Sequence, residues 1–149
     1  QSDAGDLMTK RYSVTRSIQA TPQVVWGLLA DATTYADWNP TIVSIRGPIS
    51  LDGTVSLVST VNPKRTFKVN VDVMEPPRRL VWSDGMPLGL FKGERTFLLE
   101  PSGGGTRFTM IEEYTGLMSG MIFKSIPDLT ESFNQFADGL KSAAEAARS

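Results

Sequence analysis

The sequence contains no cysteine and no histidine. Without cysteine, the chain cannot form disulfides, thiolate metal sites or a cysteine nucleophile. Without histidine, it lacks the usual general base and the commonest metal ligand of proteins. Catalytic triads that depend on histidine are therefore excluded, and neither a metal nor another cofactor is expected.

The chain also lacks an excess of charge and a long apolar run. Its 15 basic and 16 acidic residues give a net charge of −1, so the composition does not indicate a binder of nucleic acid or of anionic membranes. No apolar run approaches the roughly 20 residues of a transmembrane helix. A cytoplasmic protein without a transmembrane segment is expected.

The length and composition suit one globular domain. The chain has 149 residues, of which 40% are hydrophobic and 21% are charged. We expect residues 10–149 to form a single domain and to act as a monomer or homodimer. Residues 1–9 are polar and are expected to form a flexible tail, in which Met8 marks a candidate natural start.

Hydrophobic periodicity predicts the secondary structure. Residues 10–18 alternate with a period of two, which indicates a strand. A short helix follows, which Thr21 caps and Pro22 begins, and a further helical turn ends at Pro40. The period then returns to two in six more strands, separated by turn sequences such as Asn62–Lys64; these strands are 41–47, 54–61, 65–75, 79–85, 90–100 and 106–116.

The C-terminal part is predicted to be a long amphipathic helix. Asp128 and Glu131 resemble a capping box at its start, and apolar residues recur at helical spacing as far as Ala147. A single amphipathic helix must bury its apolar stripe against the sheet. The sequence therefore predicts an α+β fold, in which a curved antiparallel sheet of about seven strands wraps around a long C-terminal helix, with two short helices after the first strand.

Several segments resemble one protein family. They are "WNP" at 38–40, "RLVWSDG" at 79–85, the stretch 89–117 and the closing helix. Together they resemble the SRPBCC superfamily of START-like, Bet v 1-like helix-grip proteins, and within it the polyketide cyclase/dehydrase-like branch. The resemblance implies a deep apolar cavity between the sheet and the C-terminal helix. Members bind lipids, sterols, hormones or polyketides, and some catalyse cyclisation or dehydration.

Strand alternation places two opposite charges on the inward face of the last hairpin. If Phe97 faces Met110 across this hairpin, then Arg95 faces Glu112. One interpretation is an ion pair that satisfies itself near the sheet edge. The other is a ligand site, in which Arg95 binds a carboxylate or enolate and Glu112 or Tyr114 moves a proton. Relatives in this branch often carry histidine where this chain has Arg95, and this difference favours anion or carbonyl binding over acid–base chemistry.

The segment "TTYADWNP" also has two interpretations. Trp38 is expected to fill the core under the short helices, while Asn39 and Pro40 form an exit turn. The resemblance implies in addition that Tyr35, Trp38 and Asn39 lie near a cavity mouth and contact a ligand. Two further charged residues, Asp84 and Arg16, are interpreted structurally, as a turn residue and as a strand-end charge that reaches solvent.

The remaining candidate ligand contacts are apolar side chains that alternation or the resemblance places near the cavity; ordinary core packing is the alternative for each. They are Val71, Trp82, Phe91, Phe97, Met110, Met118, Met121 and Phe133. For residues 116–126 a role at a membrane surface is a further interpretation, but Lys124 is the only local positive charge.

Three functions follow from these observations. The leading hypothesis is binding of a hydrophobic small molecule, such as a lipid, quinone or polyketide-like compound. The first alternative is a metal-free enzyme of the cyclase or dehydratase type, which the absence of histidine disfavours. The second is a partner-binding module of the Hsp90-activator-like type, for which the sequence shows no dedicated apolar patch or charge stripe.

Overall fold

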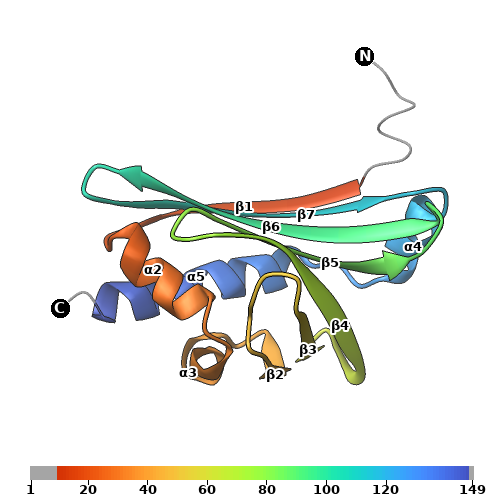
Figure 1. Ribbon diagram of the computed structural model, residues 1–149, viewed down its shortest axis with the longest axis horizontal. Coiled ribbons are helices and arrows are strands. Elements are labelled where there is room, and N and C mark those ends of the chain that lie inside the picture. The colour runs from red at the N-terminus through yellow and green to blue at the C-terminus, as the bar shows by residue number, and fades with distance from the viewer. Residues whose placement is uncertain (1–9, 148–149) are drawn as a thin grey trace, which may run out of the picture.

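The computed structural model describes residues 10–147, so the predicted tail at 1–9 lies outside the described residues. Seven strands form one antiparallel sheet in the order β1-β7-β6-β5-β4-β3-β2, and the long helix α5 crosses one of its faces (Figure 1). The strands are β1 (Lys10–Ile18), β2 (Ile42–Arg46), β3 (Thr54–Ser59), β4 (Asn62–Glu75), β5 (Arg79–Met86), β6 (Phe91–Ser102) and β7 (Gly105–Thr115). The helices are α2 (Pro22–Leu29), η1 (Ala32–Thr34), α3 (Tyr35–Trp38), α4 (Ser119–Ser125) and α5 (Thr130–Ala147). This is the predicted α+β architecture.

Helix α5 packs on the concave face of the sheet through the predicted stripe. Phe133, Phe136 and Leu140 on this helix are buried in the same core as residues of β5, β6 and β7. The helix begins at Thr130, two residues later than predicted, since Asp128 Oδ1 accepts a hydrogen bond from the Thr130 backbone nitrogen at 2.9 Å. Burial of this stripe on the sheet supplies the main apolar interface of the molecule.

The register of the β6–β7 hairpin confirms the sequence prediction. Phe97 pairs with Met110, and Arg95 pairs with Glu112. Phe97 and Met110 are fully buried under α5. Because side chains alternate along a strand, the same register brings both charges onto the concave face.

Strand β4 departs from the sequence prediction at two places. It begins at Asn62, because Ser59 pairs with Asn62 and leaves only two residues for the turn; Pro63 is tolerated near the strand start. Farther along, a register shift lets Val71 face Trp82 while Val73 faces Val81. An extra residue in one strand reverses the alternation beyond it. Beyond the shift, Met74 packs against the core.

The short helices form because their ends are satisfied locally. Thr21 Oγ1 accepts a hydrogen bond from the Val24 backbone nitrogen at 3.3 Å, as predicted for the cap of α2. At the other end of this region, α3 approaches α5 at Gly139. A Cβ atom on Gly139 would lie 2.2 Å from the Trp38 carbonyl oxygen, so the absence of a side chain there permits the contact.

Arg16 does not extend freely into solvent, contrary to our prediction. Its Nε donates to Asp138 Oδ1 at 2.7 Å, and its Nη2 donates to Asn134 Oδ1 at 2.8 Å. Asp138 and Asn134 both lie on α5, which crosses beside β1. Arg16 therefore connects the first strand to the last helix, which sequence periodicity alone could not reveal.

Candidate functional site

A cluster of polar side chains lies on the otherwise apolar concave face. Arg95 Nε donates to Glu112 Oε1 at 2.5 Å, and the Tyr114 hydroxyl donates to Glu112 Oε2. The side chains of Arg95 and Glu112 are 18% and 16% exposed. Both side chains are therefore mostly buried, but solvent or a ligand can still contact them.

Aromatic rings surround the ion pair. The Arg95 Cζ atom lies 4.9 Å from the ring centroid of Phe133 and 5.7 Å from that of Phe136, both on α5. Stacking on these rings offsets part of the cost of removing the guanidinium from water. On the α4 side, the ring of Tyr12 lies 5.5 Å from that of Phe123. The cluster thus lies between α5, α4 and the sheet.

Tyr114 is held as a hydrogen-bond donor. Its ring stacks on Phe91 at 5.9 Å and contacts Phe123 at 5.6 Å. Burial raises the pKa of the Tyr114 hydroxyl, and the adjacent Glu112 carboxylate raises it further. Tyr114 therefore keeps its proton at neutral pH and suits donation rather than proton abstraction.

Asp84 joins this cluster, although its sequence context suggested a turn. It lies within β5 and pairs with Gly93, which in turn pairs with Tyr114. A Cβ atom on Gly93 would lie 3.1 Å from Asp84 Oδ1 and 3.3 Å from Tyr114 Cε1, so the glycine lets these two side chains approach each other. Burial, followed by the charge of Glu112, raises the pKa of the Asp84 carboxyl.

Alternation could have revealed Asp84. Leu80 and Trp82 are buried on the concave face, and Asp84 is the next residue in that series. The Ser-Asp-Gly sequence favoured a turn and outweighed the alternation. The strand continues to Met86 because Asp84 and Gly85 both pair with β6.

Several predicted ligand contacts are packed into the core. Val71, Phe97 and Met110 are fully buried, and Trp82 packs edge-on against Phe97 with ring centroids 4.9 Å apart. Phe133 is also buried, next to Arg95. These side chains contact one another at the centre of the sheet, so a role in ligand contact stays a prediction.

The three predicted mouth residues lie in the interior. Tyr35 is fully buried, and its hydroxyl donates to the Leu29 carbonyl at 2.6 Å; burial raises its pKa. Trp38 packs against Phe136 with ring centroids 5.4 Å apart. Asn39 Oδ1 accepts from the Thr41 backbone nitrogen at 3.0 Å, while its Nδ2 is buried without a partner among the described residues. Tyr35 and Trp38 thus fill the core, although Trp38 and Asn39 also line a surface depression beside α5, and ligand contact by these residues stays a prediction.

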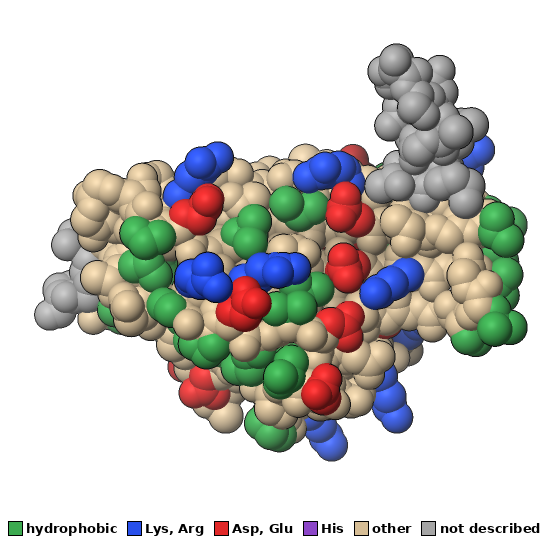
Figure 2. Space-filling model, turned by 45° about the horizontal axis from the view of Figure 1, so that its top comes forward, with side chains coloured by type: hydrophobic (Ala, Val, Ile, Leu, Met, Phe, Trp, Pro, Cys, Tyr) green, Lys and Arg blue, Asp and Glu red, His purple; other side chains and the backbone are tan. Residues whose placement is uncertain are grey.

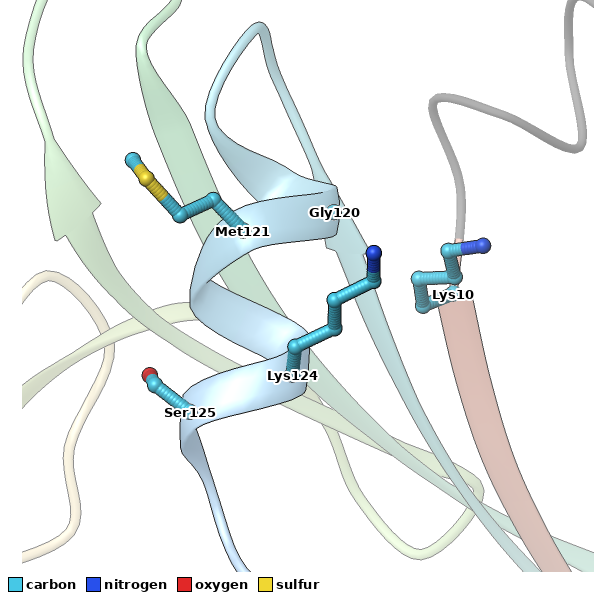
Figure 3. Close-up of a pocket in the computed structure, with 5 residues that line it drawn as sticks. All are labelled: Lys10, Gly120, Met121, Lys124 and Ser125. Atoms are coloured by element: carbon cyan, nitrogen blue, oxygen red, sulfur yellow. The ribbon is translucent and has the colours of Figure 1, made fainter.

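The α4 end and the α3 end each carry a surface depression. The first, of about 630 Å³, is lined by Lys10 and by α4, including Met121 (Figure 3). The second, of about 520 Å³, lies between α3 and α5 and is lined in part by Asn39. Met118 precedes α4 and is half-buried. Neither depression is lined by Arg95 or Glu112.

Residues 10–147 contain no group of three or more acidic, histidine or cysteine side chains that could hold a metal ion. None of their helices is long and apolar enough to cross a membrane.

The fold is the helix-grip fold of the SRPBCC superfamily. The chain belongs to the polyketide cyclase/dehydrase and lipid transport family, whose model matches residues 9–145. No curated protein matches the sequence.

Solved structures share the fold at low sequence identity. The Zhui aromatase/cyclase of a Streptomyces species has a TM-score of 0.72 and 14% identity, over 92% of this chain and 94% of its own. A protein from Rhodobacter sphaeroides has a TM-score of 0.72 and 20% identity, over 95% and 94%. A point mutant of norcoclaurine synthase from Thalictrum flavum, solved with a transition-state analogue, has a TM-score of 0.72 and 14% identity, over 95% and 97%.

Proposed function

We propose that this protein binds a small, largely apolar molecule that carries a carbonyl or carboxylate group. The observation that carries the proposal is the Arg95–Glu112–Tyr114 cluster on the concave apolar face. Polar groups that are kept in an apolar interior at a desolvation cost are typical of sites that orient a ligand. The family, which includes polyketide cyclases and lipid transporters, supports the same class of ligand.

Arg95 supplies the polar contact in this proposal. Its bond to Glu112 uses Nε, and the guanidinium carries several further N–H donors. These donors suit a carbonyl or carboxylate oxygen. The apolar part of the ligand would contact Phe91, Phe123 and Tyr12, which are half-buried at the α4 end.

Binding of a matched pair of probes tests this proposal. Naphthoate carries a carboxylate and naphthalene does not. We expect naphthoate to bind the wild type and to bind at least about tenfold more weakly to Arg95→Met/Glu112→Leu, while naphthalene binds both equally. Arg11→Met/Glu113→Leu is the control, because it also removes one charge of each sign, from an exposed pair that joins β1 and β7. Equal binding of naphthoate to all variants contradicts the proposal.

A second candidate function is proton transfer on such a ligand, as in a dehydratase or cyclase. Asp84 favours it, because burial raises the pKa of this half-buried carboxyl, which therefore keeps its proton to a higher pH than an exposed carboxyl does. In a dehydration, Arg95 would polarise the carbonyl and the Glu112 carboxylate would accept the α-proton, while protonated Asp84 would donate a proton to the hydroxyl that leaves as water. A β-hydroxy ketone that loses water to give a conjugated enone reports the reaction by absorbance. Acceleration by wild type and its loss in Asp84→Asn are expected; no acceleration by wild type contradicts this candidate.

The cytoplasmic location and the monomeric or homodimeric state stay predictions. Gel filtration combined with light scattering measures the oligomeric state directly.

A further inference from the structure

Two loops at the α4 end expose large apolar side chains on one continuous surface. They are the β5–β6 loop and the β7–α4 loop. The backbone nitrogen of Leu117 donates to the Gly89 carbonyl at 3.1 Å, and that of Met118 donates to the Leu90 carbonyl at 2.8 Å, so the two loops are joined. We call the exposed side chains the apolar tip: Met86, Leu88, Leu117 and Met121. Figure 2 shows hydrophobic side chains gathered at this end of the molecule, on the right.

Leu88 is poorly suited to its own turn. The Leu90 backbone nitrogen donates to the Pro87 carbonyl at 3.3 Å, and φ is 62° at Leu88 and 73° at Gly89. These angles are those of a type I′ turn, which favours Asn-Gly at its two central positions. Leucine at the first position adds backbone strain, and its side chain is 92% exposed. Folding therefore does not account for a leucine here.

Two lysines lie beside the apolar tip. Residues 85–91 and 115–123 contain no charged side chain. Lys124 follows directly, and Lys10 from β1 lines the same depression as Met121 and Lys124 (Figure 3). Among the described residues, neither lysine forms an ion pair. The fold thus adds a second lysine, distant in sequence, to the single one noted in this segment.

We propose that the apolar tip inserts into the surface of an anionic lipid bilayer, with Lys10 and Lys124 at the phosphate groups. Leucine and methionine side chains that protrude from the surface need no complementary pocket in a bilayer, whereas a protein partner would have to supply one. Lysines beside them add attraction to anionic headgroups. This proposal goes beyond ligand binding and does not depend on it.

Vesicle flotation with the full chain tests the apolar contribution. We expect binding to vesicles of phosphatidylcholine and phosphatidylglycerol, and weaker binding to phosphatidylcholine alone. Leu88→Asn should weaken binding by about tenfold, while the folded state is kept because asparagine suits the turn. Leu51→Asn is the matched control: Leu51 is also exposed but lies outside the apolar tip, in a turn beside β4, and its variant should bind as wild type.

A second pair of variants tests the charges. Lys10→Gln/Lys124→Gln should weaken binding to the anionic vesicles by about tenfold at low salt, and added salt should shrink this difference. Lys64→Gln/Lys68→Gln removes the same charge from exposed positions on β4 and should bind as wild type. The proposal fails if wild type does not float with anionic vesicles, or if the control variants lose as much binding. It also fails if Leu88→Asn abolishes a dimer in sedimentation and leaves vesicle binding unchanged, since the apolar tip would then join two copies of the chain.

Discussion

At the scale of single residues, the ion pair on the concave face makes the most direct prediction. Arg95→Met leaves Glu112 desolvated with only the Tyr114 hydroxyl as a partner. We expect a loss of about 2 kcal/mol in the free energy of unfolding, below the value for fully buried pairs because the side chains keep some contact with solvent. Arg95→Met/Glu112→Leu should recover most of this loss, since neither charge remains. Urea unfolding of wild type, Arg95→Met, Glu112→Leu and the double variant measures the coupling energy between the two side chains. Additive losses in the free energy of unfolding would show that the two side chains do not interact.

Asp84 makes a prediction about pH. Its pKa in the folded state is raised by burial above the unfolded value of about 3.9. Between these two values the native state binds more protons than the unfolded state, so stability falls as pH rises through that window. Asp84→Asn removes this fall.

The variant of Asp84 should therefore be more stable than wild type at neutral pH, with a gain that appears above about pH 4 and is absent below it. Urea unfolding across this range measures the gain. A variant that is less stable than wild type at neutral pH would mean that the carboxylate makes a favourable contact in its ionised form.

The sequence predicted that Arg95 and Glu112 face each other on the concave side, but it did not predict that Asp84 lies on the same face. The first two follow from alternation along a regular hairpin, which fixes which side chains share a face. Asp84 lies on the same face by the same rule, yet its neighbours are typical of a turn. Its raised pKa depends on burial and then on the charge of Glu112, which lies on another strand, and no local sequence pattern contains that information.

At the scale of elements, the contact between α3 and α5 depends on one glycine. A methyl group at Gly139 would meet the Trp38 carbonyl, and the backbone of α3 cannot move without disturbing Trp38 in the core. Gly139→Ala should lower the free energy of unfolding by about 2 kcal/mol or more.

Gly27 is the matched control for Gly139. It lies inside α2, and an added Cβ meets nothing within 4 Å. Gly27→Ala should therefore raise stability by about 0.5–1 kcal/mol through helix propensity. Thermal or urea unfolding of both variants provides the comparison, and equal effects would show that the close approach to Trp38 is not tight.

The elements themselves were predictable where local signals agree. The cap at Thr21 and the stripe on α5 follow from residue chemistry and spacing within one segment. The bulge in β4 was not predictable, because an inserted residue matters only through the strand that pairs with it. The contacts of Arg16 with α5 join positions far apart in the chain, so they also required the fold.

At the scale of the whole molecule, the two ends of the concave face differ. The end under α2 and α3 is filled by Tyr35, Trp38 and Phe136, which are buried and in ring contact. The α4 end carries the polar cluster, half-buried aromatic rings and the apolar tip. A ligand that enters at the α4 end would meet Arg95 without opening the packed core.

This asymmetry predicts where the molecule opens. Helix α4 has seven residues, too few to be stable alone, and Met121 on it is exposed. Strands β6 and β7 are paired on both sides and lie in the same core as α5. Amide hydrogen exchange in α4 should therefore be about 100-fold faster than in β6 and β7. Naphthoate should slow exchange in α4 while β6 and β7 change little, since only α4 must open to admit it. If α4 exchanged as slowly as β7, a ligand would have no entrance there, and the depression between α3 and α5 would be the remaining route.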